Sequence, residues 1–437
     1  SWIERNAFAR PRTVWATPLL ADRLVHWIGQ FDFFGKPAPL SFKAPFFKSL
    51  AHQARTLARA APRIVATAER IRALRALICF GAAVPGAQNR LIQARQQLQP
   101  VLETWPEHGM IPERNPSAQL AVLRDLVDNR ACLQAAHYEP PGAREPAIGR
   151  AARALAARRH GDGALALFHG GAEEDATFCD VVLALAGAEA ARPARYNGGY
   201  QRAVRGDAVL VFDAAPPPPR LHDRGAHAGT LAFELSAGAA RLVVNCGAYR
   251  GADAAWRDAG RVTAAHSTLV LDDRNSAKVV AGDGLRLGPR DVPCDRQEDE
   301  SASWIAASHD GYVRRFGLLH RRGLFLARDG GDLRGEDRLL PPPGQAVPRR
   351  TLGKAFSIRF HLHPDVVVGE PERDLSGAVA IPFGSGESGP WHLAAEGRFA
   401  ATVEESFYLG TGDAPRRTKQ LVLTGRIDSD AGAEARG

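Results

Sequence analysis

Pairs of polar residues two positions apart are the first places in this sequence where chemistry could occur. His361 and His363 form one pair, and Tyr200 and Arg202 form another. Residues two apart on a β-strand point to the same face, so each pair could act on one ligand. The histidines could belong to a metal site, although no third ligand is near them in sequence. Tyr200 and Arg202 could equally be ordinary neighbours on one strand.

An acidic run and scattered cysteines offer two further kinds of chemistry. Glu173, Glu174 and Asp175 could supply the paired carboxylates of a hydrolase, but they stand at a predicted helix start, where they suit the helix dipole. The five cysteines are far apart and include no CxxC pair. This argues against a disulfide framework and against a cysteine-based zinc site. We expect the cysteines to be small buried apolar residues.

Composition and charge are those of a globular chain of two or three domains. Of 437 residues, 45% are hydrophobic and 24% charged, which argues against disorder. The net charge of +8 is spread along the chain, so it indicates an anionic partner or a solvated basic surface, and no nucleic acid is expected. No apolar run reaches the roughly 18 residues of a membrane span, so none is predicted.

The beginning of the sequence indicates a longer natural chain. The first residue is Ser1, and the single methionine is Met110. Charged residues stand where a signal peptide would need an apolar core, so no leader can be read from this N-terminus. We expect further residues before Ser1.

Residues 13–188 show a helical pattern. Apolar residues recur every three or four positions in two stretches, Leu19, Leu20, Leu24, Val25 and Ile28, then Ile64, Val65, Ile71, Leu74, Leu77 and Ile78. Turn formers at 35–39, 85–86, 106–112 and 140–146 separate the helical stretches. The pattern predicts about six or seven helices joined by short loops, an all-α array of hairpins.

Asn115 is the clearest helix start. Its side chain can accept from early amides as an N-cap, Pro116 suits the first turn, and we expect the helix to reach Arg130. The period changes after residues 187–195 from that of a helix to that of a strand. The domain boundary is predicted there.

Beyond residue 196, turn formers separate short β-rich runs. These runs occupy 208–212, 230–235, 241–245, 267–271, 304–307, 323–327, 356–361 and 420–423. Many antiparallel strands at this spacing predict a sandwich or barrel, and a two-layer sandwich suits the length of the segment better. Proline runs at 216–219 and 341–343 predict rigid polyproline-like connectors.

Three stretches carry a resemblance: AHAGTLAFELSAGAARLVVNCG at 226–247, TAAHSTLVLDD at 263–273 and SHDGYVRRFGLLHRRGLFLARDGGDLRGEDRL at 308–339. They resemble the sandwich domain of heparinase II/III-like proteins, in a bacterial branch of the polysaccharide lyase superfamily with unassigned substrate. FHLHPDV at 360–366 and RNPSAQL at 114–120 are similar to that branch too. The resemblance implies a multidomain α + β fold, with an N-terminal (α/α) toroid-like domain of helical hairpins at 1–190 and an antiparallel β-sandwich domain at 196–437.

Family members of this kind cleave the glycosidic bond beside a uronic acid by β-elimination. The proton next to an ionised carboxylate is weakly acidic, so the site needs donors that neutralise the carboxylate and a Tyr or His that moves the proton. The resemblance implies Asn115 at the cleft, although N-capping alone would explain this residue. It also implies His169 as the base in place of the family's tyrosine, and Tyr200 and Arg202, in YNGGYQR at 196–202, as contacts to the uronate.

His227 matches the second histidine of the family's His-x-His-x-Asp pattern, in which the first histidine acts in chemistry and the second binds a metal. Gly225 and Gly229 replace the first histidine and the aspartate, and the family's other metal ligands fall on Asn245 and His266. A neutral amide is a poorer zinc ligand than a carboxylate. Either these residues hold zinc or another divalent metal in a structural role, or no cofactor is required and the histidines are hydrogen-bonded.

Two further regions could complete the site. Without a metal, His222 or His227 could take over part of the missing histidine's role. The stretch around Arg314 could supply a basic rim that contacts substrate, and alternation places only some of its side chains in the cleft. The rim residues are Tyr312, Arg314, Arg315, His320, Arg321 and Arg322.

Two functions therefore stay open. One is a lyase acting on a glycosaminoglycan or other uronate polymer through Asn115, His169, Tyr200 and His227. The other is a catalytically degenerate glycan-binding or cell-envelope biogenesis protein of the same fold. In both, an acidic polysaccharide is the partner, the resemblance implies the periplasm or cell envelope, and the sequence specifies no oligomeric state.

Overall fold

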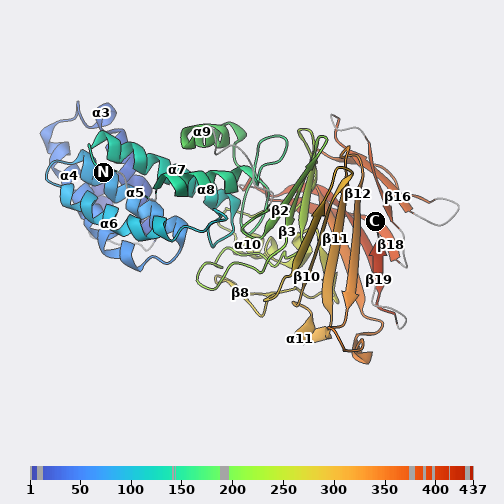
Figure 1. Cartoon of the computed structure of the whole chain (residues 1–437). Helices are drawn as coiled ribbons and strands as arrows, with labels where there is room; N and C mark the ends of the chain where they lie inside the picture. Colours follow the sequence, from blue (N-terminus) through green and yellow to red (C-terminus); the bar gives the residue numbers. More distant parts are fainter. Residues whose placement is uncertain are drawn as a thin grey trace. The chain divides into compact units, whose positions relative to one another are not determined.

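The chain is seen in a computed structural model that describes residues 2–6, 13–139, 142, 144–187, 196–373, 379–386, 390–395, 399–412, 414–428 and 434–436. It divides into two compact units, shown in Figure 1. The first comprises Ser1–Ile111, Gln119–Ala152 and Val182–Ala191, and the second comprises Pro112–Ala118, Arg153–Val181 and Arg192–Gly437. The predicted boundary near 190 lies outside the described residues.

The first unit is built from helices. They are α1 (Trp2–Asn6), α2 (Thr17–Gly29), α3 (Phe31–Phe34), α4 (Leu40–Ala60), α5 (Thr67–Ala83), α6 (Gln88–Glu103), most of α7 (Pro116–Ala135) and α8 (Arg144–Ala156), and part of α9 (Ala176–Ala186). Most of the periodic apolar residues predicted from the sequence face its interior: Leu20, Leu24, Ile71, Leu74 and Leu77 are buried, whereas Leu19 and Val65 are exposed. Burial of this stripe holds the short helices together, since few would be stable alone.

Two helix boundaries differ from the prediction. Ile64 and Val65 lie before α5, because a 3-10 turn at Ala61–Arg63 comes first and the helix begins only at Thr67. The predicted break at 140–146 ends earlier, since α8 begins at Arg144 and contains Pro146. A proline is tolerated in the first helical turn, where amides have no helical partner. Pro140 and Pro141 lie outside the described residues.

The second unit is built mainly from antiparallel strands. One sheet has nine strands in the described residues, in the order β1-β2-β3-β4-β5-β13-β19-β18 with β6 also paired to β13. Its strands are β1 (Tyr196–Asn197), β2 (Tyr200–Arg205), β3 (Ala208–Asp213), β4 (Phe233–Ala237), β5 (Ala240–Val244), β6 (Leu269–Leu271), β13 (Ala355–Leu362), β18 (Phe399–Tyr408) and β19 (Arg416–Arg426). All the pairings are antiparallel, as the sequence predicted.

Three smaller sheets complete the described part of this unit. The five-stranded sheet contains β9 (Cys294–Glu298), β10 (Ala302–His309), β11 (Leu319–Ala327), β12 (Leu333–Leu340) and β20 (Glu434–Arg436). The four-stranded sheet contains β14 (Val367–Val368), β15 (Glu372–Arg373), β16 (Val379–Gly384) and β17 (Trp391–Ala395). A two-stranded sheet contains β7 (Lys278–Val279) and β8 (Leu285–Arg286), and the short helices are α10 (Ala254–Ala259) and α11 (Val313–Phe316).

One apolar core joins the nine-stranded and five-stranded sheets. Leu210, Phe233 and Ile358 enter it from the larger sheet, and Ile305 and Leu324 enter it from the smaller one. Every strand predicted from alternation is present. The strands predicted at 304–307, 323–327, 356–361 and 420–423 are longer at one or both ends, because pairing continues where the pattern becomes polar, whereas those predicted at 230–235 and 267–271 begin later, at Phe233 and Leu269. The proline runs at 216–219 and 341–343 lie outside strands, as predicted.

Several site residues lie at strand ends or directly after them. Tyr200 begins β2, Asp213 ends β3, and Asn245 follows β5 directly. Backbone pairing fixes these positions, since Tyr200 is the register partner of Asp213. The described helices include none that is both long and apolar enough to cross a membrane.

Candidate functional site

Asn115 caps α7 and at the same time holds the loop that carries His169. Its Oδ1 accepts from the amide of Ala118 at 3.0 Å, which confirms the predicted N-cap, and its Nδ2 donates to the carbonyl of His169 at 2.9 Å. His169 and Gly170 both have positive φ angles, of 47° and 88°. A non-glycine residue in this region is uncommon and requires support from its surroundings. Here the Asn115 amide provides that support.

His169 is buried, and both of its ring nitrogens face protein atoms. Nδ1 accepts from the backbone amide of His227 at 3.3 Å, so Nδ1 carries no proton. The proton of the neutral ring is therefore on Nε2, which lies 3.2 Å from Oδ2 of Asp213. Burial lowers the pKa of His169, and it outweighs the opposing effect of Asp213. The ring is thus held neutral in one tautomer.

Arg114 fixes Asp213 from the other side. An Nη2 hydrogen bond joins its guanidinium to Oδ1 of Asp213, while Nη1 donates to the carbonyl of Pro216 at 2.6 Å and Nε to that of Gly198 at 3.1 Å. Burial alone would raise the pKa of Asp213, but the charge of Arg114 and the contact with His169 together lower it below its usual value. Asp213 is therefore an ionised carboxylate with a cationic partner.

Tyr200 lies between two guanidinium groups. The Cζ atoms of Arg114 and Arg158 lie 4.5 Å and 4.2 Å from the centre of its ring, within the range of cation–π interactions. Its hydroxyl donates to the carbonyl of Arg114 at 2.6 Å. Because the side chain is fully buried, the pKa of the phenol is raised above its usual value. Tyr200 thus acts as a packed, hydrogen-bonded residue in this structure.

His227 and His266 form a hydrogen-bonded pair. Nδ1 of His266 donates to the carbonyl of Val262 at 2.8 Å, which leaves Nε2 of His266 to accept from Nδ1 of His227 at 3.1 Å. Burial lowers the pKa of His266 to about 4 and that of His227 well below its usual value. Both rings are therefore neutral near pH 7. Among the described residues, Nε2 of His227 has no hydrogen-bond partner.

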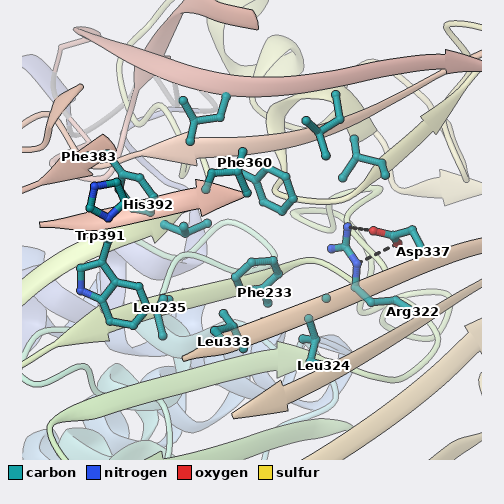
Figure 2. A pocket seen from close by; sticks show the side chains of 16 residues that line it. Phe233, Leu235, Arg322, Leu324, Leu333, Asp337, Phe360, Phe383, Trp391 and His392 are labelled. Atoms are coloured by element: carbon teal, nitrogen blue, oxygen red, sulfur yellow. Dashed lines mark hydrogen bonds and ion pairs between the residues drawn. The ribbon is translucent and has the colours of Figure 1, made fainter. Parts of the chain in front are cut away.

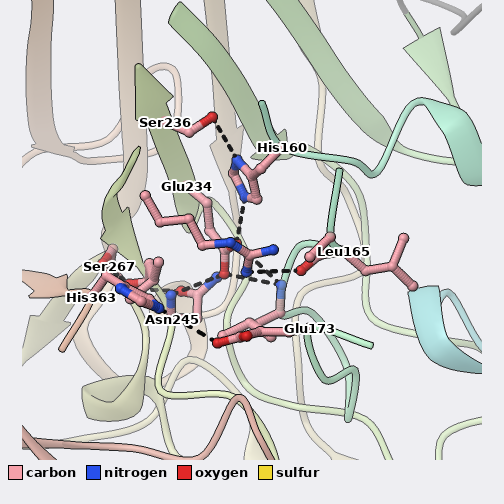
Figure 3. A network of polar contacts seen from close by, with 12 residues as sticks. His160, Leu165, Glu173, Glu234, Ser236, Asn245, Ser267 and His363 are labelled. Carbon is pink, nitrogen blue, oxygen red and sulfur yellow. Dashed lines mark hydrogen bonds and ion pairs between the residues drawn. The ribbon is translucent and has the colours of Figure 1, made fainter. Parts of the chain in front are cut away.

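A second buried carboxylate, that of Glu234 on β4, accepts several hydrogen bonds (Figure 3). Its oxygens accept from Nε2 of His160 at 2.9 Å, from the amide of Leu167 at 3.1 Å, and from both the amide and Nδ2 of Asn245 at 2.9 Å. Ser236 contacts the other nitrogen of His160 at 3.1 Å. These internal donors satisfy the carboxylate without any ligand.

The predicted metal ligands do not fit a metal as they lie. The carboxamide of Asn245 is occupied on both sides, because its oxygen accepts from the amide of Ser267 at 3.0 Å and its nitrogen donates to Glu234. His227 and His266 bind each other through the nitrogens that would face an ion. No group of three or more His, Cys, Asp or Glu side chains suited to a metal occurs in the described part of the chain. A structural metal here stays a prediction.

The two predicted substrate arginines lie in different places. Arg202 is half-buried on β2, two residues after Tyr200, and burial lowers its pKa to about 10. Arg314 is exposed on α11 and lines a separate groove with Arg274, Lys278 and Arg315. Of the other rim residues, Tyr312, His320 and Arg322 are buried. The structure therefore joins Arg202, and not Arg314, to the surroundings of Tyr200.

Two other predicted places of chemistry have structural roles. Asp175 accepts from the amide of Phe178 at 2.6 Å at the start of α9, as predicted for a helix start, and Glu173 contacts the hydroxyl of Tyr408. His361 and His363 have different partners: His361 contacts Ser406 Oγ at 2.8 Å and the carbonyl of Ala264 at 2.9 Å, whereas His363 lies 3.5 Å from Glu173.

His222 also has a partner outside the buried network. Its Nδ1 lies 3.3 Å from Oε1 of Glu113. This hydrogen bond raises the pKa of His222 above its usual value, whereas burial lowers those of His169 and His227.

The expectation that the cysteines are buried is correct for only part of them. Cys179 and Cys246 are buried, while Cys79, Cys132 and Cys294 are half-buried. Cys79 and Cys132 come from different helices, so their sequence separation concealed that they are neighbours.

Arg114, Asp213, His160 and Glu234 were missed by the sequence interpretation. Glu234 had a visible signal, because it is a single acidic residue inside the apolar run 230–235. A charge in a buried strand needs partners, so it marks a polar network. Asp213 ends a strand and Arg114 precedes the predicted cap, and neither position differs from an ordinary surface residue in sequence.

An apolar cavity lies elsewhere, among the sheets of the second unit (Figure 2). It measures about 80 Å³ and is lined by side chains such as Phe233, Leu324 and Phe360, with the Arg322–Asp337 ion pair at its wall. Of the residues predicted to act on substrate, only Arg322 of the predicted rim lines it, and its guanidinium is paired with Asp337. The polar network around His169 and Glu234 therefore remains the candidate site.

Comparison with known proteins decides the family. The sequence profile described as Heparinase II/III-like, C-terminal, matches residues 189–433. This chain belongs to the heparinase II/III-like family. FtsZ-localized protein C of Caulobacter vibrioides is 30% identical over 448 aligned positions, which cover 99% of this chain and 74% of that protein. The predicted resemblance is confirmed.

Solved structures of heparinase-type lyases share the fold. A crystal structure of heparinase III matches with a TM-score of 0.73 at 12% identity, over 100% of this chain and 72% of that chain. Heparan sulfate lyase HepC from Pedobacter heparinus matches with a TM-score of 0.66 at 15% identity, over 100% and 70%. At these identities the likeness concerns the arrangement of helices and antiparallel sheets. The catalytic residues must be judged from this chain itself.

Proposed function

We propose that this protein is a heparinase II/III-like member that binds an acidic polysaccharide without cleaving it. The observation that carries the proposal is the state of His169, whose two ring nitrogens face the amide of His227 and the carboxylate of Asp213. A general base needs a ring nitrogen that can reach the substrate proton. His169 offers none without rearrangement.

The other expected catalytic groups support the same proposal. The Asn115 amide, expected to bind the uronate carboxylate, caps α7 and holds the carbonyl of His169. The Tyr200 hydroxyl donates to the carbonyl of Arg114, and burial raises its pKa. A lyase must neutralise a carboxylate and move a proton in one place. Here internal partners occupy both kinds of group.

Arginines concentrated around Tyr200 support binding of an anionic ligand. Arg114 and Arg158 stack on Tyr200, and Arg202 follows two residues later on β2. Asp213 is the carboxylate that compensates Arg114. Burial lowers the pKa of Arg158 to about 9 and that of Arg202 to about 10. This shift is the expected cost of a buried cation, and a uronate would reduce it.

The test compares binding with turnover on a panel of uronic-acid polymers. Turnover would produce an unsaturated uronyl group, whose near-ultraviolet absorbance rises with time. We expect retention on the acidic polymer without that rise. Arg202→Gln should weaken binding about tenfold, the value of one charge-assisted contact. Arg205→Gln on the same strand removes an equal charge that already pairs with Glu298 and should leave binding unchanged. Turnover by the wild-type chain contradicts the proposal.

Lyase activity is the second candidate, because one ring nitrogen remains available. Nε2 of His227 carries a lone pair and no hydrogen bond among the described side chains, and His266 fixes the tautomer. It is the base that a lyase built on this chain would use. In that case His227→Gln abolishes product formation, while His392→Gln, at an exposed histidine on β17, retains it.

For the cell biology, we propose that this chain localises with FtsZ at the cell envelope. Its support is the 30% identity to FtsZ-localized protein C over 99% of the chain. Sedimentation of the full chain with FtsZ polymers tests the association, with serum albumin as the control. Recovery of the chain in the supernatant at all FtsZ concentrations would count against it. The periplasmic location predicted from the family is tested by fractionation of cells.

The architecture within each of the two units is also a proposal, because it goes beyond the shared fold. We infer an (α/α) toroid-like helical unit and a β-sandwich, because the heparinase III match covers 100% of this chain. A crystal structure of the full chain tests both arrangements.

A further inference from the structure

Cys79 and Cys132 bring their sulfur atoms unusually close together. Cys79 lies on α5 and Cys132 on α7, and their Sγ atoms are 2.8 Å apart. A disulfide requires about 2.04 Å between the sulfurs. A shift of less than one ångström would therefore join two residues that are 53 positions apart in sequence.

The hydrogen bond with Cys79 favours a thiolate at Cys132, and the charge of Arg75 adds to it, whereas burial and the charge of Asp128 oppose it. Arg75 stands one turn before Cys79, and Asp128 stands one turn before Cys132. The guanidinium of Arg75 binds Asp125 at 2.7 Å and Asp128 at 2.9 Å, so the cation is held in place near the sulfurs. Positive charge and a donated hydrogen bond both stabilise a thiolate.

The two thiols differ in acidity, which assigns their roles. The hydrogen bond between them lowers the pKa of Cys132 and raises that of Cys79. Cys132 is therefore the thiol that ionises first and acts as the attacking group, while Cys79 loses its proton later and reacts second. Both side chains are half-buried, so a small oxidant can reach them, in contrast to the buried Cys179 and Cys246.

We propose that Cys79 and Cys132 form a reversible disulfide that ties α5 to α7, made by exchange with a low-molecular-weight disulfide such as glutathione disulfide. The Cys132 thiolate attacks one sulfur of glutathione disulfide, its S–S bond breaks, and one glutathione thiolate leaves. Cys79 then loses its proton to water and attacks Cys132 Sγ, which releases the second glutathione. Two protein thiols are oxidised, and one glutathione disulfide is reduced to two thiols.

The bond would stiffen the helical unit. It closes a loop that contains the end of α5, all of α6 and most of α7, the helix that Asn115 caps. Closing a loop of this length removes freedom from the unfolded chain and raises its stability. We expect the oxidised protein to melt about 5–10 °C above the reduced one.

The experiment uses the full chain equilibrated in glutathione buffers of increasing oxidising power. Remaining thiols are then alkylated under denaturing conditions and the peptides analysed by mass spectrometry. We expect two of the five thiols to disappear together, with a peptide cross-linked through Cys79 and Cys132. Cys79→Ser should stop the reaction at a glutathione adduct on Cys132. Cys294→Ser, at a half-buried cysteine far along the chain, should leave the cross-link intact.

Two results would overturn the proposal. One is full alkylation of Cys79 and Cys132 after equilibration with glutathione disulfide. The other is loss of the Cys79 thiol in Cys132→Ser to the same extent as in the wild type. The melting shift between oxidised and reduced protein should vanish in Cys79→Ser, whose far-ultraviolet circular dichroism confirms that it is folded.

Discussion

Two buried clusters in this protein combine Arg, Asp and His in the same way. In the candidate site, Arg114 binds Asp213, which faces Nε2 of His169, and a backbone amide donates to Nδ1 of that ring. In the five-stranded sheet, Arg322 binds Asp337 with two hydrogen bonds of 2.9 Å and 2.8 Å, and Nε2 of His320 lies 2.6 Å from the same carboxylate.

The second cluster contains no predicted catalytic residue, since His320 and Arg322 were predicted only for a substrate-contacting rim, and this similarity is informative. His309 extends this hydrogen-bonded cluster. The amide of Gly311 donates to its Nδ1 at 3.1 Å, and its Nε2 lies 3.3 Å from Nδ1 of His320. Every polar atom of these two rings has a partner. A fixed neutral histidine beside an ionised aspartate is therefore a stabilising arrangement in this fold, and it does not by itself indicate a catalytic pair.

The clusters differ in what surrounds them. The site cluster also has the guanidinium of Arg158 against Tyr200, and a ring nitrogen of His227 that makes no hydrogen bond in the described part of the chain, whereas the sheet cluster has neither. The site also joins segments around residues 114, 169, 213 and 227, while Arg322 and Asp337 are direct partners on paired strands. The groups that suit the site to bind a ligand are therefore Arg158 and Nε2 of His227, and not the Asp–His contact.

The largest expected effect is at the sheet cluster. Asp337→Asn removes the partner of Arg322, whose side chain is 1% exposed, and leaves a buried cation without compensation. We expect the free energy of unfolding to fall by about 3–5 kcal/mol. Urea denaturation followed by circular dichroism measures it. Asp332→Asn, in an exposed pair with Arg334, should change it by less than about 1 kcal/mol.

The same change at the site sharpens the comparison. Asp213→Asn leaves Arg114 without its carboxylate, so a purely structural cluster should lose about 3–4 kcal/mol of unfolding free energy. If the cluster is instead kept for ligand binding at a cost in stability, Asp213→Asn should lower the free energy of unfolding only slightly or raise it. The exposed Asp207, just before β3, provides the matched Asp207→Asn control. If Asp213→Asn and the wild type are equally stable, the site cluster does not have the stabilising role of the sheet cluster.

The buried histidines predict a loss of stability in mild acid. The folded pKa of His266 is about 4, below the usual value near 6.5, so the unfolded chain binds a proton first as the pH falls. His266 alone should therefore reduce the unfolding free energy by roughly 2–3 kcal/mol between about pH 6.5 and pH 4. The contribution of His266 to the free energy of unfolding is fully present well above pH 6.5.

His266→Gln is the variant that tests this pH dependence. It should flatten the decline, as measured by urea denaturation at each pH, while His26→Gln at an exposed helical position should not. An unchanged slope in His266→Gln would assign the acid sensitivity to other groups.

The smallest effect concerns Tyr200. Tyr200→Phe removes the hydrogen bond to the Arg114 carbonyl but keeps the ring between the two arginines, so we expect a loss of about 1 kcal/mol. Tyr249→Phe, at a half-buried position, is the control. If Tyr200 were an acid or base, turnover on any polymer that the wild type cleaves would disappear with no comparable loss of stability.

Periodicity in the sequence determined most of the elements. The strands at 208–212, 241–245 and 356–361 were visible because their apolar residues face a core, and Asn115 was visible because a cap before proline is a local signal. Ile64 and Val65 were placed in a helix that begins only at Thr67. A short 3-10 turn that contains Pro62 overrides the periodic pattern there.

The partners of the site residues were decided by the tertiary structure. The sequence supplied His169, Tyr200 and His227 as candidates from their resemblance to a family. It could not show that Arg114 would meet Asp213, 99 positions away, or that Cys79 would meet Cys132, 53 positions away. Side-chain periodicity carries information about faces over a few residues. Contacts between distant segments depend on how strands pair and helices pack, and those contacts determine whether a histidine is free to react.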